Sequence, residues 1–203
     1  MLSNMDKGRR QLVGIIGLFL LPPVLAWVAW AYLDAHGVSA THNTGTLIQP
    51  ARPLPRAGLI APDTGLPYDF AMLRGRWFYV IYAGEECAVS CQDQLYVTRQ
   101  IRIGVNKDTQ RVRRLLITQQ PLKSSQQNLL AEQHPDLILM QLGDSTARQA
   151  WLQPFQDAGL DTTGTLYFLV DPLGNLMMMY DDAMSPKGIL RDLQKLLKIS
   201  QIG

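Results

Sequence analysis

The stretch that decides the fold is RWFYVIYAGEECAVSCQ, residues 76–92. Its first part, residues 76–82, is short and rich in aromatic and branched side chains, which is typical of a buried β-strand. The next four residues, AGEE, predict a turn that leads into a helix. The two cysteines of the chain, Cys87 and Cys91, fall at the start of that helix. The stretch therefore predicts a strand–turn–helix unit with both thiols at its junction.

Outward from this unit, strand and helix patterns alternate towards the C-terminus. Further strands are predicted at residues 111–118, 137–142, 165–170 and 176–180, the last two forming a hairpin around the turn sequence DPLGN. Helices are predicted at residues 126–133, 145–158 and 186–199. A βαβ start followed by a β-hairpin and a terminal helix predicts an α/β, thioredoxin-like fold.

The N-terminal part contains an uncharged, apolar segment at residues 11–33. At a rise of about 1.5 Å per residue it is long enough to cross a hydrocarbon core of about 30 Å, which predicts a transmembrane helix. Basic residues precede it and aromatic residues crowd its far end. The positive-inside rule then places residues 1–10 in the cytoplasm and the rest of the chain across the membrane. The alternative is a cleaved signal peptide, because Ala29-Trp30-Ala31 imitates a cleavage site.

The segment that follows, residues 34–62, contains four prolines and few long apolar runs. This composition predicts a partly extended periplasmic linker ahead of a folded domain at residues 63–203. His36 and His42 lie in this segment and are interpreted as solvated residues, not as metal ligands.

The formal charge of +2 arises entirely at the N-terminus. The chain has 19 Lys or Arg residues and 17 Asp or Glu residues. Lys7, Arg9 and Arg10, opposed there by Asp6 alone, account for the whole excess. From residue 11 onward the charges balance, and a neutral body lacks the positive excess on which nucleic-acid binding relies. Nucleic acid is therefore not an expected partner.

The placement of the cysteines predicts reactive thiols. Unpaired N–H groups and the dipole at a helix start favour a thiolate, whereas the neighbouring Glu85 and Glu86 raise the pKa of a thiol. A spacing of four brings both sulfur atoms to one side of the first turn. Three roles follow from the residues alone: an exchangeable disulfide if Cys87 lies outside the helix, a two-thiolate site for a soft cation such as Cu(I), or a structural pair.

Three features together resemble the Sco/SenC family of membrane-tethered thioredoxin-like proteins. They are the N-terminal anchor, the Cys-x-x-x-Cys motif after the first long strand, and the late hairpin from Tyr167 to Asn175. The resemblance covers roughly residue 59 to the C-terminus. It implies a role in assembling the copper centre of cytochrome c oxidase subunit II, with Cys87 and Cys91 as both the thiol-exchange residues and the copper ligands.

The copper-binding histidine of that family has no counterpart in this chain. Counted back from Asp171-Pro172, its position falls on or beside Thr163. The resemblance then implies either Cu(I) held by the two cysteines alone, or thiol–disulfide exchange in which Cys87 attacks and Cys91 resolves the mixed disulfide. His134 is interpreted as a solvent-facing loop residue, and the run Met177–Met179 as hydrophobic packing, since strand side chains alternate between faces.

The expected protein is thus a single-pass protein of the inner membrane with its C-terminal domain in the periplasm. Its expected partners are cytochrome c oxidase subunit II or other oxidase assembly factors. One alternative is a non-catalytic Sco-like scaffold or interaction module whose cysteines form a structural disulfide. A second alternative, a general periplasmic disulfide reductase, is weakened by the four-residue spacing of Cys87 and Cys91.

Overall fold

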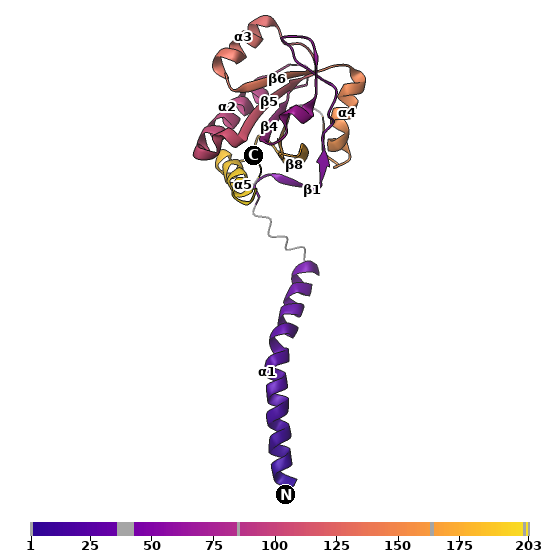
Figure 1. Ribbon diagram of the computed structural model, residues 1–203, viewed down its shortest axis with the longest axis vertical. Helices are drawn as coiled ribbons and strands as arrows, with labels where there is room; N and C mark the ends of the chain where they lie inside the picture. Colours follow the sequence, from indigo (N-terminus) through magenta and orange to yellow (C-terminus); the bar gives the residue numbers. More distant parts are fainter. Residues whose placement is uncertain (1, 36–42, 85, 163–164, 201, 203) are drawn as a thin grey trace. The chain divides into compact units, whose positions relative to one another are not determined.

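The computed structural model describes residues 2–35, 43–84, 86–162, 165–200 and 202. The chain divides into two units, residues 1–42 and residues 43–203. The first unit contains one helix, α1 (Leu2–Ala35), whose part from Gly8 to Leu33 has a mean hydropathy of 2.3. Among the described residues, α1 is the one helix that is long and apolar enough to cross a membrane (Figure 1). This agrees with the helix predicted for residues 11–33.

An eight-stranded sheet forms the centre of the second unit, in the order β1-β8-β7-β4-β5-β6-β2-β3 (Figure 1). The strands are β1 (Thr46–Pro53), β2 (Leu59–Ile60), β3 (Pro67–Tyr68), β4 (Trp77–Tyr82), β5 (Val112–Thr118), β6 (Leu137–Leu142), β7 (Leu166–Val170) and β8 (Asn175–Tyr180). The neighbours β4, β5 and β6 run parallel, and every other pair is antiparallel. The five strands predicted from the sequence are all present.

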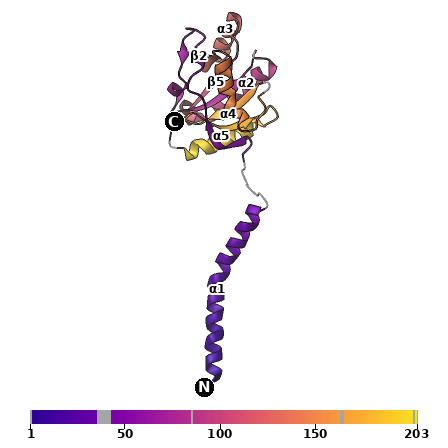
Figure 2. The same cartoon turned by 90° about the vertical axis from the view of Figure 1, so that its right-hand side faces the viewer.

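Helices cover both faces of this sheet. One face carries α2 (Val89–Gly104), α3 (Ser124–Gln133) and α5 (Pro186–Ile199), and the other carries α4 (Ser145–Gln156) and the short 3-10 helix η1 (Phe70–Leu73). A second 3-10 helix, η2 (Asn106–Arg111), joins α2 to β5. Figures 1 and 2 show α3 and α5 at opposite ends of this unit.

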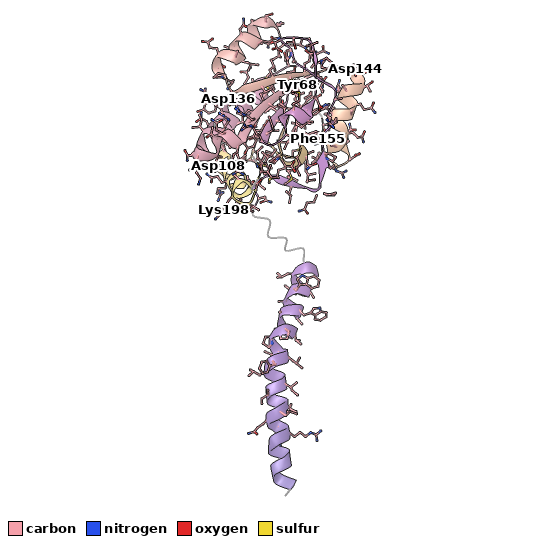
Figure 3. The ribbon with its side chains drawn as sticks, in the orientation of Figure 1. Tyr68, Asp108, Asp136, Asp144, Phe155 and Lys198 are labelled. Atoms are coloured by element: carbon pink, nitrogen blue, oxygen red, sulfur yellow. A yellow bond between two sulfur atoms is a disulfide. The ribbon has the colours of Figure 1, made fainter. Side chains whose placement is uncertain are left out.

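The central strand β4 is buried at all six positions because helices lie on both of its sides. Phe78, Val80 and Tyr82 pack in the cluster under α4, to which Phe155 contributes (Figure 3). The alternate residues of β4 pack under α2 and α5. A strand covered on both faces has no polar side, which explains the continuous apolar run in the sequence. The predicted α/β, thioredoxin-like fold is confirmed.

The structure corrects the predicted boundary between linker and domain. β1 and β2 lie within residues 34–62, and the folded unit begins at Asn43 instead of residue 63. β1 is an edge strand that pairs only with β8, so Pro50 and Pro53 are tolerated without loss of a central ladder bond. Most of its residues are exposed, and an exposed, proline-containing strand has the composition of a linker.

The start of the folded unit is tied to α5 by a buried carboxylate. Asp192 is 2% exposed, and its Oδ2 accepts hydrogen bonds from the backbone N–H groups of Thr44 (2.7 Å) and Gly45 (2.9 Å). We expect Asp192→Ala to lower the free energy of unfolding by about 3 kcal/mol, because two buried donors lose a charged acceptor. Urea unfolding followed by tryptophan fluorescence measures the loss. Asp192→Asn, which keeps one acceptor oxygen, should lose less, and equal losses would contradict this assignment.

Candidate functional site

The turn between β4 and α2 is fastened to the end of the neighbouring strand. Gly84 has φ +43°, a conformation that a residue without a side chain adopts most readily. Its carbonyl oxygen accepts a hydrogen bond from the Gln119 N–H (2.8 Å), and the Ala83 N–H donates to the Ile117 carbonyl (2.9 Å). The chain therefore leaves the sheet at a fixed point, immediately before the first cysteine.

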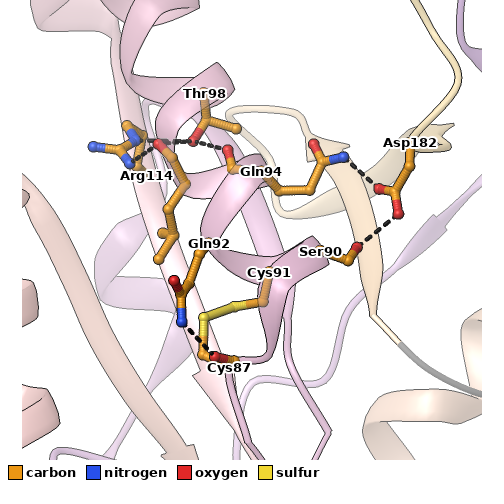
Figure 4. The surroundings of a disulfide bond; sticks show 9 residues. Cys87, Ser90, Cys91, Gln92, Gln94, Thr98, Arg114 and Asp182 are labelled. Atoms are coloured by element: carbon orange, nitrogen blue, oxygen red, sulfur yellow. Dashed lines mark hydrogen bonds between the residues drawn. A yellow bond between two sulfur atoms is a disulfide. The ribbon is translucent and has the colours of Figure 1, made fainter.

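Cys87 and Cys91 form a disulfide with their Cα atoms 5.1 Å apart (Figure 4). Cys87 precedes the helix, Ala88 is the N-cap residue of α2, and Cys91 lies in the first helical turn. A pair at this spacing can bond because the first cysteine is outside the helix, where its backbone is free to bring the two Cα atoms within the usual disulfide range of about 4.4–6.8 Å. A disulfide is thus formed, which is compatible with both the exchangeable pair and the structural pair predicted from the sequence.

The two sulfur atoms differ in accessibility. Cys91 is 0% exposed and packs in the hydrophobic cluster with Tyr79 and Leu95, whereas Cys87 is 9% exposed. Both cysteines are therefore buried, and Cys87 is the less deeply buried of the two and the one that lines a pocket beside α2. This asymmetry suits the predicted roles, with Cys87 as the exchanging sulfur and Cys91 as the buried partner.

Hydrogen bonds hold the first turn of α2 in place (Figure 4). The Ser90 hydroxyl donates to Asp182 Oδ2 (2.6 Å), and the Gln94 side-chain amide donates to Asp182 Oδ1. Asp182 belongs to the turn between β8 and α5, so it connects the disulfide helix to a distant part of the chain. On the side of the first cysteine, Gln92 Nε2 donates to the Cys87 carbonyl (3.3 Å). We call the contact of Ser90 and Gln94 with Asp182 the Asp182 clamp.

A fully buried arginine lies beneath α2. Arg114 of β5 is 0% exposed and uses its whole guanidinium group: Nε donates to Thr98 Oγ1 (3.1 Å), Nη1 to Asp136 Oδ1 (3.0 Å) and Nη2 to the Leu95 carbonyl. Burial lowers the pKa of Arg114, and Asp136 opposes that shift. Sequence reasoning did not identify this residue. Its position on the same strand face as the core residues Val112 and Leu116 was the available signal.

The structure contradicts the solvent-facing interpretation of His134. The residue is 9% exposed, and its Nδ1 lies 3.4 Å from Arg114 Nη2. Burial lowers the pKa of His134, and the positive charges of Arg114 and Arg99 lower it further. We assign the neutral imidazole, with Nδ1 as acceptor and the proton on Nε2. A proline after His134 had suggested an exposed loop, but His134 is the C-cap residue of α3 and lies against the buried Arg114 of β5.

Stability is expected to fall as the pH drops below about 6.5, the ordinary histidine value. Because the folded pKa of His134 is lowered, the unfolded chain takes up the proton first, and acid therefore favours unfolding until the folded group is protonated too. The measurement is the free energy of unfolding at pH 7.5 and pH 5.5 for the wild type and His134→Gln. The difference in the free energy of unfolding between the wild type and His134→Gln should be smaller at pH 5.5 than at pH 7.5. An equal difference at both pH values would contradict the lowered pKa of His134.

The residues that could hold a metal ion are few. Within the described ranges, no group of three or more His, Cys, Asp or Glu side chains is arranged to bind one. After reduction, Cys87 and Cys91 supply two soft thiolate ligands, which suit Cu(I). His134 faces two arginines and is a poor third ligand. Thr163, Glu85, His36 and His42 lie outside the described residues.

The methionine run packs as predicted. Met178 is 1% exposed, and its sulfur accepts a hydrogen bond from the Tyr180 hydroxyl at 3.6 Å. Met177 and Met179 are half-buried. Met179 packs against the cluster on the other face of the sheet, whereas Met177, where the β7–β8 pairing shifts register, packs against the same cluster as Met178.

The fold and the cysteine pair define the class of the protein: a thioredoxin-like protein with a disulfide at the junction of its central strand and the following helix. The chain belongs to the family described as transmembrane-like, thioredoxin-like, C-terminal domain, whose model matches residues 77–200. No curated protein sequence matches the chain.

Solved structures of Sco proteins share this fold, as the sequence resemblance implied. Apo Sco1 from Thermus thermophilus is 16% identical with a TM-score of 0.59, and the match covers 76% of this chain and 96% of that one. Yeast Sco1 with copper bound is 16% identical with a TM-score of 0.58, covering 75% and 96%. A thiol:disulfide interchange protein from Bacteroides sp. is 10% identical with a TM-score of 0.55, covering 74% and 91%. At these identities the likeness shows the fold alone.

Proposed function

We propose that this protein is a membrane-anchored accessory protein for cytochrome c oxidase assembly that exchanges thiols and disulfides with the copper-site cysteines of oxidase subunit II. The anchor is α1 in the inner membrane. The basic residues before it favour a cytoplasmic N-terminus and a periplasmic thioredoxin-like domain. The periplasm is an oxidising compartment, where a disulfide persists until a partner reduces it.

The observation that carries this proposal is the asymmetric Cys87–Cys91 disulfide. Exchange needs one sulfur that a partner can reach and a second that completes the reaction from inside the protein. Cys87 lies ahead of α2 and lines a pocket, and Cys91 is fully buried in the first turn of the helix. In the reduced protein, the Cys87 thiolate attacks a disulfide of the partner, and Cys91 then attacks Cys87 to release the partner as a dithiol. The start of α2 favours the thiolate form.

Delivery of Cu(I) by the same two cysteines is the second candidate. It is favoured by the structural neighbours that carry the same fold with copper bound, from yeast and Arabidopsis thaliana. Copper is then a cargo held by two thiolates, and its transfer requires the disulfide to be reduced first. The chemistry of the donor set fits Cu(I) better than Cu(II), since both donors are soft thiolates.

The test is oxidase activity in membranes of a strain that lacks this protein. The wild-type chain should restore the activity, and a chain carrying Cys87→Ser and Cys91→Ser should not. Restoration by added copper without the protein would favour copper delivery over exchange. Full restoration by the double variant would overturn both candidates and support the non-catalytic scaffold with a structural disulfide. Asp182→Asn, which leaves both sulfur atoms in place, serves as the control for damage to α2.

A further inference from the structure

A pocket of 390 Å³ opens beside the disulfide, between α2 and α3. This volume is at the lower end of the range for sites that take small organic ligands, about 300–1,000 Å³. Its walls are formed by Cys87, Gln92, Leu95, Tyr96, Arg99, Leu122, Gln126, Leu129, Leu130, Glu132, Gln133 and His134. Thiol–disulfide exchange with a protein partner does not require a cavity next to the reacting sulfur atom.

The pocket gives direct access to the disulfide. Cys91 is fully buried and is not part of the lining, whereas Cys87 is part of it. A thiolate breaks a disulfide by attacking one of its two sulfur atoms. A ligand seated in this pocket therefore meets the one sulfur that is open to attack.

The pocket lining carries one basic and one acidic side chain, Arg99 and Glu132. Arg99 lies in its wall and, among the described residues, forms no ion pair or hydrogen bond. Arg114 adds a buried charge behind Leu95 and His134, although Asp136 partly offsets it. Glu132, exposed at the end of α3, is the only acid among the described lining residues. An anionic ligand is favoured, because unpaired Arg99 offers it a partner.

We propose that this pocket binds a small thiol that carries a carboxylate, and that it presents the thiolate to Cys87. The inference rests on the proposed exchange function and names its electron donor by class. Leu122 and Leu130 provide apolar walls for the carbon chain, and Arg99 pairs with the carboxylate. The polar side chains of Gln126 and Gln133 offer further donors at the rim.

The reaction balances with two molecules of the thiol. The first thiolate attacks Cys87 Sγ, the Cys87–Cys91 bond breaks, and Cys91 leaves as a thiolate. A mixed disulfide between Cys87 and the small thiol results. A second thiolate attacks the small-molecule sulfur of this mixed disulfide, which releases Cys87. The two small thiols are oxidised to their disulfide, and their two protons end on the reduced cysteines.

The experiment compares three small thiols that differ in charge. Oxidised full-length protein in detergent micelles is mixed with 3-mercaptopropionate, 2-mercaptoethanol or cysteamine, and acid-quenched samples are analysed by mass spectrometry for the mixed disulfide. Each rate is divided by the rate of the same thiol with a small-molecule disulfide, 2-hydroxyethyl disulfide, because thiolates of different pKa differ in intrinsic nucleophilicity. The anionic thiol should react about tenfold faster than the cationic one, with the neutral thiol between them. The preference should shrink at high salt, since exposed charges are screened.

Variants distinguish ligand binding in the pocket from the general reactivity of the disulfide. Arg99→Gln should remove the charge preference, so that the anionic thiol loses its advantage over the neutral and the cationic thiols. The matched control is Arg148→Gln on α4, which covers the opposite face of the sheet and should keep the preference. Equal rates for all three thiols, or a preference that survives Arg99→Gln, would overturn the pocket assignment while leaving the exchange function intact.

Two further outcomes are informative. A cysteine-containing acidic peptide that reacts faster than 3-mercaptopropionate at equal thiolate concentration would assign the pocket to a protein segment and overturn the small-thiol proposal. An inert disulfide, unreactive even with dithiothreitol in the folded protein, would overturn the proposed exchange function itself. The two failures are therefore distinguishable in one series.

Discussion

Replacement of both cysteines, Cys87→Ser with Cys91→Ser, should abolish thiol–disulfide exchange entirely, because the sequence contains two cysteines and no other thiol. The single variants should differ from each other. Cys87→Ser removes the accessible sulfur and should leave no detectable exchange. Cys91→Ser keeps the attacking thiol but loses the resolving one, so a mixed disulfide at Cys87 should accumulate. Mass spectrometry after incubation with an oxidised peptide substrate measures both results.

The same double variant should lose stability only modestly. The disulfide closes a very short loop, for which the chain-entropy model predicts about 2 kcal/mol. Wild-type protein reduced with dithiothreitol is the control, and its free energy of unfolding should match that of the double variant. A Cys91→Ser variant that exchanges with full turnover would contradict the resolving role. Loss of folding in the reduced wild type would instead indicate a structural disulfide.

Arg114→Met should have the largest effect on stability, a loss of about 3–5 kcal/mol. The substitution removes the hydrogen bonds to Thr98, to the Leu95 carbonyl and to Asp136. Asp136 keeps its ion pair with Arg102, so the groups inside the fold that lose this donor are Thr98 and the Leu95 carbonyl. Methionine fills much of the volume, so the loss reports mainly on the polar contacts. The midpoint of urea unfolding, followed by tryptophan fluorescence, measures it.

The neighbouring residue supplies the matched control for this prediction. Arg113→Met changes the same kind of side chain on the opposite face of β5, where the residue is half-buried. It should cost less than about 1 kcal/mol. Similar losses for Arg113→Met and Arg114→Met would contradict a specific role for the buried guanidinium group. Arg114→Met should also raise the pKa of His134, because the positive charge next to the imidazole is removed.

The central part of the fold and the cysteine site could be predicted because local patterns specify them. A continuous apolar run indicates a strand covered on both faces, and the cysteines follow it directly. The edge strand β1 could not be predicted in this way. Its prolines and exposed residues are compatible with a strand only because β8 supplies a partner from the far end of the sequence. Pairing between distant segments leaves no local pattern.

The buried polar residues could not be predicted from local patterns either. Arg114 stands among several basic residues, and only strand alternation with Val112 and Leu116 places it inside. Its partners come from two other segments: Thr98 and the Leu95 carbonyl belong to α2, and Asp136 lies just before β6. His134 was misassigned for the same reason, since its neighbour Arg114 comes from a separate segment, β5. The pocket could not be predicted either, because α2 and α3 become neighbours only in the folded chain.

The Asp182 clamp has a consequence for motion during the redox cycle. Ser90 and Gln94 bind a carboxylate from outside α2, and neither bond involves a sulfur atom. Breaking the disulfide therefore leaves the helix anchored, and the freedom gained is expected at Glu86, Cys87 and Ala88. Amide hydrogen exchange should accelerate there and remain unchanged in α2. The oxidised and reduced proteins then present almost the same shape, so a partner must distinguish them by the chemistry at one sulfur atom.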